Sequence, residues 1–304
     1  MNVKNQTLVS EFVLLGFQNL HYFKIPLFSL FLLIYIMTVW ENVLIIVLVS
    51  SSQNLQSPMY FFLQQLSLCD LLGSSNIVTS LLQTVINEEV TFSFFGCITQ
   101  YSLFCLTEVF ECFILAVMSY DRYVAICIPL SYTSIMSHRV CVTFTLMSWA
   151  LGFGITVITV NLIGTLQFCD QNTINHFFCD LLPIIELSCS DTFLVQLEAI
   201  IGTIPVAISP FILICVSYMC IAHAILKIVS NTGRQKAFST CSSHLAVVVL
   251  FYGTLISVYV VPPGKQSQTM IKVLSVIYTI VIPLVNPLIY SLRNKDMNAA
   301  LKKL

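Results

Sequence analysis

Three carboxylic acids, Asp70, Glu108 and Glu111, lie within apolar stretches of the chain. A charge at the centre of a membrane helix costs about 2.5 to 3.5 kcal/mol, so residues of this kind usually have a function. Glu111 lies ten residues before Asp121, at a depth where it could meet Asp70 and Asn286 on neighbouring helices. Oxygen ligands favour small hard cations, so these three residues are predicted to hold Na⁺. The sequence indicates no required cofactor.

Glu108 and Glu111 are three residues apart and therefore share a face of a helix. That face is expected to continue through Cys105 and Phe104 and to line a cavity. Within this cavity, Glu108 would either bind an amine or, when neutral, donate a hydrogen bond. His223 is interpreted as a structural residue, because a lone His in an apolar helix usually bonds a neighbouring helix.

A second polar group follows the apolar run 112–118 in the segment "SYDRYVAICIPLSY", which contains Asp121, Arg122 and Tyr123. The segment "VNPLIY" places Asn286 and Tyr290 around Pro287. Proline frees a backbone carbonyl and kinks a helix, and Pro58 and Pro210 are further expected hinges. We interpret the two segments as one cluster that rearranges.

The elements that must position these residues are membrane helices. The chain has 304 residues, of which 57% are hydrophobic and 9% charged, whereas a soluble domain carries roughly 25% charged residues. Apolar blocks of about 20 residues cross a bilayer as helices. We identify seven blocks, at 25–50, 58–82, 97–121, 141–165, 195–226, 237–261 and 271–292. The predicted fold class is an all-α membrane protein, a single bundle of seven transmembrane helices.

The distribution of cations orients this bundle. Nine Lys and Arg residues lie on the side of the C-terminus and four on the other side, although the net charge is only −1. The positive-inside rule therefore predicts an extracellular tail at 1–24, a membrane domain at 25–292 and a cytoplasmic tail at 293–304. A short amphipathic helix is expected in the last of these. The first block is expected to act as an uncleaved signal anchor.

Two further features agree with an exterior N-terminus. The sequon at Asn5 is a candidate glycosylation site. Four of the twelve cysteines, Cys97, Cys169, Cys179 and Cys189, lie at the outer start of the third block or in the loop after the fourth. In an oxidising exterior they would form two disulfides, with three possible connectivities.

Several function classes lack support in the sequence. There is no nucleotide-binding, metalloprotease or hydrolase motif, and no nucleic-acid partner is indicated. An enzyme within the membrane would need a paired nucleophile and base, which the blocks do not contain. A channel or transporter that uses Asp70, Glu41 and Glu111 remains an alternative, but inverted repeats are absent.

Five segments together resemble the vertebrate odorant receptors of tetrapod type, a branch of the rhodopsin-like G-protein-coupled receptors. They are "SPMYFFLQQLSLCD", "SYDRYVAICIPLSY", "INHFFCDLLPIIELSCSD", "KAFSTCSSHLAVVVLFYG" and "NPLIYSLRN". The resemblance extends from the second block to the C-terminus. It implies a multi-pass plasma-membrane receptor that binds a small organic odorant and activates a stimulatory, olfactory-type G protein, which raises cyclic AMP. A receptor of the same fold for an internal metabolite, peptide or lipid is the alternative within this class.

The resemblance also implies roles for particular residues. Arg122 would pair with Asp121 at rest and then receive the C-terminal helix of a G-protein α subunit, together with Tyr218 and Tyr290. Lys236 and Ser239 would lie at the inner start of the sixth helix, and Trp149 would be structural. The implied disulfides are Cys97 with Cys179 and Cys169 with Cys189. The implied ligand-binding residues are Phe104, Cys105, Glu108, Gly202, Val206, Tyr252, Leu255, Tyr259, Val276 and Thr279.

Three positions depart from the family pattern. Glu41 precedes Asn42 where Gly is usual, so its carboxyl group must be protonated, paired or in contact with a polar cavity. Val285 replaces a common Leu, which changes little. Glu108 is unusual at this depth and would either bind an amine or donate a hydrogen bond when neutral, although Phe104 occupies the position where amine receptors carry an Asp.

Overall fold

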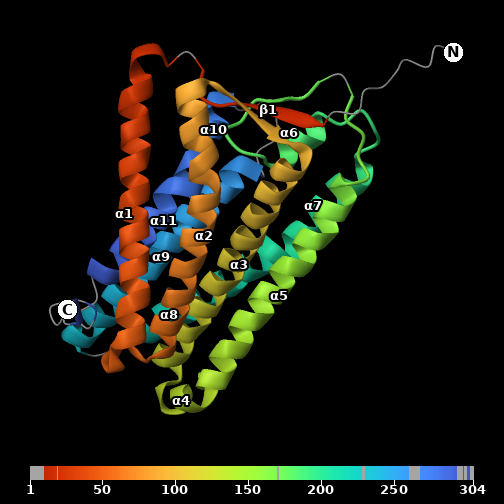
Figure 1. The fold of residues 1–304 in the computed structure, drawn as a ribbon. Coiled ribbons are helices and arrows are strands. Elements are labelled where there is room, and N and C mark those ends of the chain that lie inside the picture. Colours follow the sequence, from red (N-terminus) through yellow and green to blue (C-terminus); the bar gives the residue numbers. More distant parts are fainter. Residues whose placement is uncertain are drawn as a thin grey trace, which may run out of the picture.

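The computed structural model describes residues 10–18, 20–169, 171–227, 230–259, 268–292, 297 and 300–301. Asn5 and almost all of the tail 293–304, with its expected amphipathic helix, lie outside the described residues. The described chain forms a bundle of long helices with a small sheet at one end and the short helix α4 (Tyr132–Ile135) at the other (Figure 1). We call these the sheet end and the α4 end.

Six helical stretches of the described chain are long and apolar enough to cross a membrane. They run from His21 to Ser51, Phe94 to Cys127, His138 to Ile163, Phe193 to Leu226, Cys241 to Tyr259 and Gln268 to Tyr290. Helix α2 (Pro58–Asn87) is 30 residues long but more polar, because its buried face carries Ser67, Asp70, Ser74 and Thr84. The polar residues that belong to the interior thus lower the hydropathy of this helix.

The helices of the structure extend beyond most of the apolar blocks. Helices α1 (Lys24–Ser51), α2, α3 (Phe94–Cys127) and α5 (His138–Ile163) each extend beyond the predicted block at one end or at both. The next stretch consists of α7 (Phe193–Thr203), a π-helical turn η4 (Ile204–Ile208) and α8 (Ser209–Leu226). Helix α9 covers Asn231–Tyr259, and α10 (Gln268–Val276), the π-helical turn η5 (Ile277–Val281) and α11 (Ile282–Leu292) complete the bundle.

Local sequence signals explain several boundaries. Pro58 occupies the first turn of α2, where its missing N–H is not needed. It therefore starts a helix and does not kink one, contrary to the expectation of a hinge at this position. The Ser93 hydroxyl accepts a hydrogen bond of 3.1 Å from the Gly96 amide and caps α3. Pro287 does lie inside α11, as predicted.

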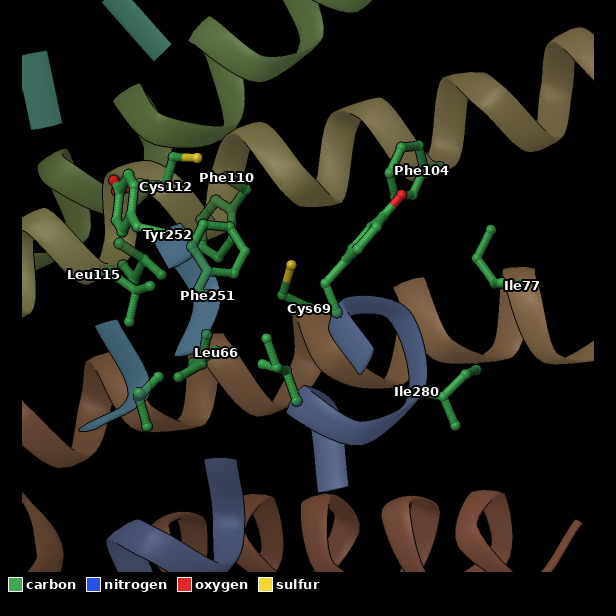
Figure 2. Close-up of a cluster of buried hydrophobic side chains, with 14 of the residues drawn as sticks. Leu66, Cys69, Ile77, Phe104, Phe110, Cys112, Leu115, Phe251, Tyr252 and Ile280 are labelled. Atoms are coloured by element: carbon green, nitrogen blue, oxygen red, sulfur yellow. The ribbon is translucent and has the colours of Figure 1, made fainter. Parts of the chain in front are cut away.

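Helix α3 occupies the centre of the bundle and packs against α2, α5 and α8. Figure 2 shows the apolar core that results, in which side chains of α2, α3, α9 and η5 meet. Phe110 of α3 is fully buried and stacks on Trp149 of α5, with ring centroids 4.1 Å apart. This contact supports the structural role expected for Trp149.

The sheet is the part of the fold that hydropathy did not indicate. Strand β1 (Glu11–Leu15) pairs antiparallel with β2 (Glu89–Ser93) and parallel with β3 (Thr173–Ile174). Phe12 and Leu14 alternate inward and are fully buried. Phe12 packs edge-on against Phe168, with ring centroids 5.2 Å apart. Part of the predicted N-terminal tail is therefore integrated into the sheet end of the bundle.

Candidate functional site

Two of the three intramembrane carboxylates meet at one amide in the centre of the bundle. The Asn286 Nδ2 atom of α11 lies 3.3 and 3.2 Å from the two carboxylate oxygens of Asp70 on α2. It also lies 3.4 Å from Glu111 Oε1 on α3. All three side chains are buried. The structure therefore brings together the three residues that the sequence predicted as a cation site.

A cavity extends from this cluster toward the sheet end. It is narrow and has room for about one water molecule. Its walls come from α2, α3, η5 and the start of α11, and Asp70, Glu108 and Glu111 are its acidic members. The wall includes the π-helical turn η5, and π-helical turns in other proteins often occur at functional sites.

Glu108 differs from the other two acids of the cavity. Its carboxylate lines the cavity and has no hydrogen-bond partner or ion pair among the described residues. Phe104, one helical turn nearer the sheet end, lines the same cavity and is 5% exposed. Thr107 completes this face of α3. Cys105 is not part of the wall, because it lies about 100° around the helix from Phe104, which corrects the predicted face.

Three of the ten predicted ligand residues line the cavity: Phe104, Glu108 and Thr279. The other seven do not, and they are Cys105, Gly202, Val206, Tyr252, Leu255, Tyr259 and Val276. Close packing explains part of this difference. The Tyr252 hydroxyl donates a 3.2 Å hydrogen bond to the Cys112 carbonyl, and its ring packs on Phe211. The lining of this cavity thus comes from α2 and from the third and seventh spans, and the fifth and sixth spans contribute no lining residue among those described.

Tyr259 belongs to a polar network at the sheet end. Its hydroxyl lies 3.0 and 3.2 Å from the carboxylate oxygens of Asp180 and 3.2 Å from the Tyr278 hydroxyl. Asp180 also caps the short helix α6 (Leu181–Glu186), accepting a 2.7 Å hydrogen bond from the Leu181 amide. Burial raises the pKa of Asp180 to about 6, although the two kinds of hydrogen bond oppose the shift. The loop after α5 is therefore attached directly to α9.

Lys272 fastens three distant segments beneath the sheet. Its ammonium donates to the Gly16 carbonyl at 2.7 Å, the Leu15 carbonyl at 3.0 Å and Asn175 Oδ1 at 2.7 Å. It is 6% exposed and forms no ion pair with a described carboxylate. Sequence reasoning treated this residue only as one of four exterior cations and gave no sign of its partners.

His176 lies beside this attachment. Its Nε2 atom is 3.2 Å from the Ser275 hydroxyl, and its Nδ1 atom is buried without a hydrogen-bond partner. Burial, together with the nearby Lys272 charge, lowers the pKa of His176 to about 3. The side chain is therefore neutral at physiological pH.

At the α4 end, Arg122 pairs with Asp121, as predicted. Both Nε and a terminal nitrogen of Arg122 donate to Asp121 Oδ2, the former at 3.0 Å. The other carboxylate oxygen accepts a 2.8 Å hydrogen bond from the Tyr132 hydroxyl. Burial and the Asp121 charge raise the pKa of Tyr132 above its ordinary range, so this hydroxyl keeps its proton. Asp121 is completely buried and holds Arg122 in one place.

The predicted switch tyrosines lie near this pair and reveal a residue that the sequence reasoning missed. The Tyr218 hydroxyl is 2.6 Å from His244 Nδ1, and the Tyr290 ring lies 6.4 Å from the His244 ring. The Tyr290 hydroxyl is buried without a hydrogen-bond partner among the described residues. Tyr123 packs on a small apolar cluster of α8 and α9. His244 belongs to the segment "KAFSTCSSHLAVVVLFYG", which was the available signal; the side chains of Lys236 and Ser239 lie outside the description.

Glu41 and Asn42 occupy one turn of α1. Asn42 Nδ2 donates 3.0 Å hydrogen bonds to the carbonyls of Thr38 and Pro283 and so joins α1 to α11. One carboxylate oxygen of Glu41 is buried without a partner among the described residues. Pairing, one of the three alternatives considered for Glu41, is therefore not observed.

Both disulfides implied by the resemblance are present. Cys97 is bonded to Cys179, and Cys169 to Cys189. Of the eight remaining cysteines, Cys215 and Cys220 are exposed on α8 and the others are buried or half-buried. The first disulfide joins α3 to the segment that carries Asp180.

Comparison with known proteins gives one consistent result. A family model described as olfactory receptor matches residues 31–304. The human protein olfactory receptor 5G3 is 45% identical over all of this chain and 96% of its own length. Human olfactory receptor 10A3 is 44% identical over the whole chain and 97% of its own length. Mouse olfactory receptor 2A7 is 45% identical over 98% of the chain and 96% of its own length.

Proposed function

Because the chain belongs to the olfactory receptor family, we propose that it binds a small organic odorant and activates a stimulatory, olfactory-type G protein that raises cyclic AMP. Members of this family are receptors and not enzymes, and the chain is a multi-pass protein of the plasma membrane with odorant ligands and G-protein coupling. The particular G protein and the cyclic AMP output are the proposed parts.

We further propose that α2 is the seventh span and that the sheet end faces the exterior. A long helix with an inward polar face is stable in a membrane when its neighbours cover that face. The excess of cations on the side of the C-terminus supports this orientation. Both disulfides lie toward the sheet end, as expected for an oxidising exterior. The domains would then be 1–24, 25–292 and 293–304, with glycosylation at Asn5.

The buried pair of Arg122 and Asp121 is the observation that carries the proposal. An Arg that merely anchored the helix in the cytoplasm would need neither a fully buried Asp partner nor the Tyr132 hydroxyl on that Asp. Release of Arg122 from this pair would free a cation at the α4 end for the G protein. Tyr218 and Tyr290, which flank His244 nearby, would contact Arg122 after an outward movement of α9.

The cavity supports the ligand-binding half of the proposal. Small-molecule sites are mostly apolar with a few polar groups, and Phe104, Ile77 and Glu108 provide that combination here. A ligand that binds the cavity of the active form more tightly than that of the resting form would shift the population toward the active form. Tyr278 and Thr279 of η5 are in contact with this cavity, and Asn286 lies on the helix that follows.

Na⁺ is the proposed occupant of the Asp70, Glu111 and Asn286 cluster. Two buried acids share one amide, and no described Lys or Arg neutralises them. No group of three or more His, Cys, Asp or Glu side chains in the described chain could hold a metal ion, so the site would depend on the amide as well. Rotating the Asn286 amide would supply a third oxygen. Bound Na⁺ would add a positive charge between the two acids and stabilise the resting form.

The test is a cyclic AMP assay in cells that contain the olfactory-type stimulatory G protein, with a broad odorant panel. Arg122→Ala should abolish ligand-dependent cyclic AMP at equal surface level. Arg139→Ala is the matched control, since Arg139 is an exposed cation at the same end of the bundle. A full response from Arg122→Ala, or an equal loss with Arg139→Ala, would refute the assignment of Arg122.

A further inference from the structure

We infer that Glu108 makes the central cavity selective for a small protonated amine; this inference rests on the proposed receptor function. The charged groups that line the cavity are all acidic. Asp70, Glu108 and Glu111 are there, and Lys, Arg and His are absent among the described lining residues. A positively charged ligand would pair with one of these acids, which have no cationic side chain beside them in the lining.

Glu108 is the acid of the three that is free to bind a ligand. Asp70 and Glu111 share the Asn286 amide at the inner end of the cavity. Glu108 lies one turn closer to the sheet end, and among the described residues its carboxylate has neither a hydrogen-bond donor nor a cation. Glu108 is half-buried, and a carboxyl group that is partly withdrawn from water without a donor is unfavourable, so a ligand N–H⁺ at this point would gain a strong charge-assisted hydrogen bond.

The charged groups nearest the cavity from other elements do not supply the missing cation. Asp180 is close enough to interact electrostatically with Glu108 and carries the same sign of charge. Lys272 directs its three donors to Leu15, Gly16 and Asn175, away from the cavity. His176 is neutral, because burial lowers its pKa to about 3. Among the described residues, the neighbouring elements therefore offer Glu108 no cationic partner.

Two aromatic rings give the cavity a second feature suited to a cation. Phe104 and Tyr278 both line it, and their ring centroids are 5.9 Å apart. The Tyr278 hydroxyl is engaged with Tyr259, which holds the ring in place. A ligand ammonium group in the same cavity could make a cation–π contact with either ring, and such contacts contribute more in a desolvated site.

The narrow shape of the cavity limits the size of the amine. Gly73 of α2 forms the wall opposite α3, and a Cβ at this position would come within 3.3 Å of the Thr107 hydroxyl. The structure thus predicts a preference for small amines, and a ligand larger than a water molecule requires Phe104 or Tyr278 to move.

The experiment compares n-butylamine with n-butanol, which has a similar shape and no charge, in the cyclic AMP assay. The wild-type receptor should respond to the amine at a concentration about tenfold or more below that for the alcohol, as one strong charge interaction provides. Glu108→Gln should lower the preference for the amine over the alcohol, measured as the ratio of the two half-response concentrations, by about tenfold or more. Glu108→Asp, which keeps the charge, should restore part of the preference.

A matched control and a second readout keep the outcomes distinct. Glu198→Gln removes an acid of α7 that bonds Thr159 at 2.9 Å and does not line the cavity, so the ratio of amine to alcohol should not change. Gly73→Ala should weaken both responses by narrowing the cavity. Ligand-induced thermal stabilisation of the purified wild-type receptor measures the same preference without a variant or a G protein.

The inference is overturned if Glu108→Gln keeps the amine preference at equal surface level. It is also overturned if the purified receptor is stabilised no more by the amine than by the alcohol. Signalling by alcohols without amines would refute the amine preference and leave the receptor function intact. Conversely, amine-dependent stabilisation without cyclic AMP would support Glu108 and refute the proposed G-protein output.

Discussion

Replacing Lys272 by Met tests whether one buried ammonium holds the sheet on the bundle. Met has a similar length and no charge, so Lys272→Met removes three hydrogen bonds with little change in volume. The bonds join α10 to strand β1 and to the loop that contains β3. Without them the carbonyls of Leu15 and Gly16 either remain buried and unpaired or open to water.

The expected magnitude follows from two opposing contributions. Hydrogen bonds to a charged group contribute about 1.5 to 3 kcal/mol each, and unpaired buried acceptors cost about 1 to 3 kcal/mol each. Burial of an ammonium without a carboxylate partner costs several kcal/mol, which the variant regains. Because the sheet can open locally and let water reach the unpaired carbonyls, the net effect is smaller than the sum of the lost hydrogen bonds. We expect the free energy of opening of β1 to fall by about 2 to 4 kcal/mol.

Hydrogen exchange measured by mass spectrometry in nanodiscs reports this loss directly. Because each 1.4 kcal/mol is about a factor of ten, amides of β1 should exchange about 30 to 1,000 times faster in Lys272→Met. Lys24→Met is the control: its ion pair with Glu88 is 2.7 Å long, but the side chains are 30% and 40% exposed. An exposed pair of this kind contributes little to stability because solvent screens it, so exchange should increase far less than in Lys272→Met.

Unchanged exchange in Lys272→Met would refute this reasoning. The packing of Phe12 and Leu14, which are both fully buried, would then suffice to hold the strand. Equal acceleration in the two variants would also count against it, because loss of exterior charge alone would explain both.

Three further predictions concern the same end of the molecule. His176 has a pKa of about 3 when folded and about 6.5 when unfolded, so the unfolded state binds more protons below pH 6.5. Between pH 7.5 and 5 the wild type should therefore lose about 2 kcal/mol in total relative to His176→Gln, with a slope that approaches about 1.4 kcal/mol per pH unit only below pH 6.5. Parallel thermal-unfolding curves would contradict this. The disulfide between Cys97 and Cys179 joins residues 82 apart, and that between Cys169 and Cys189 joins residues 20 apart. Removing the first disulfide should cost about 4.5 kcal/mol of stability and removing the second about 3.3 kcal/mol. A lower melting temperature for the variant without the second disulfide would show that chain entropy does not dominate. Gly16→Ala would place a Cβ atom against the Thr84 side chain, at a cost of about 1 to 3 kcal/mol. Hydrogen exchange of the β1 amides should therefore be faster in this variant. Unchanged exchange would mean that Thr84 moves aside freely.

Sequence alone determined the features that depend on local composition. Long apolar stretches and the scarcity of charge specify membrane helices, since a spanning segment must close its own backbone hydrogen bonds. Asp121 and Arg122 are neighbours in the chain, so their contact could be predicted without knowledge of the fold. Motif resemblance added the two disulfides and the family.

Tertiary structure decided which distant residues meet. Asn286 and Asp70 are 216 residues apart, and Lys272 and Gly16 are 256 apart; nothing in the local pattern of either residue specifies its partner. The cavity followed the same rule. Tyr252 and Tyr259 share a helix face with a predicted ligand site, but their hydroxyls bond Cys112 and Asp180, and the empty space lies instead between α2, α3 and η5. Helix periodicity determines which side chains share a face of one helix. The position of a cavity depends in addition on how neighbouring helices pack against that face.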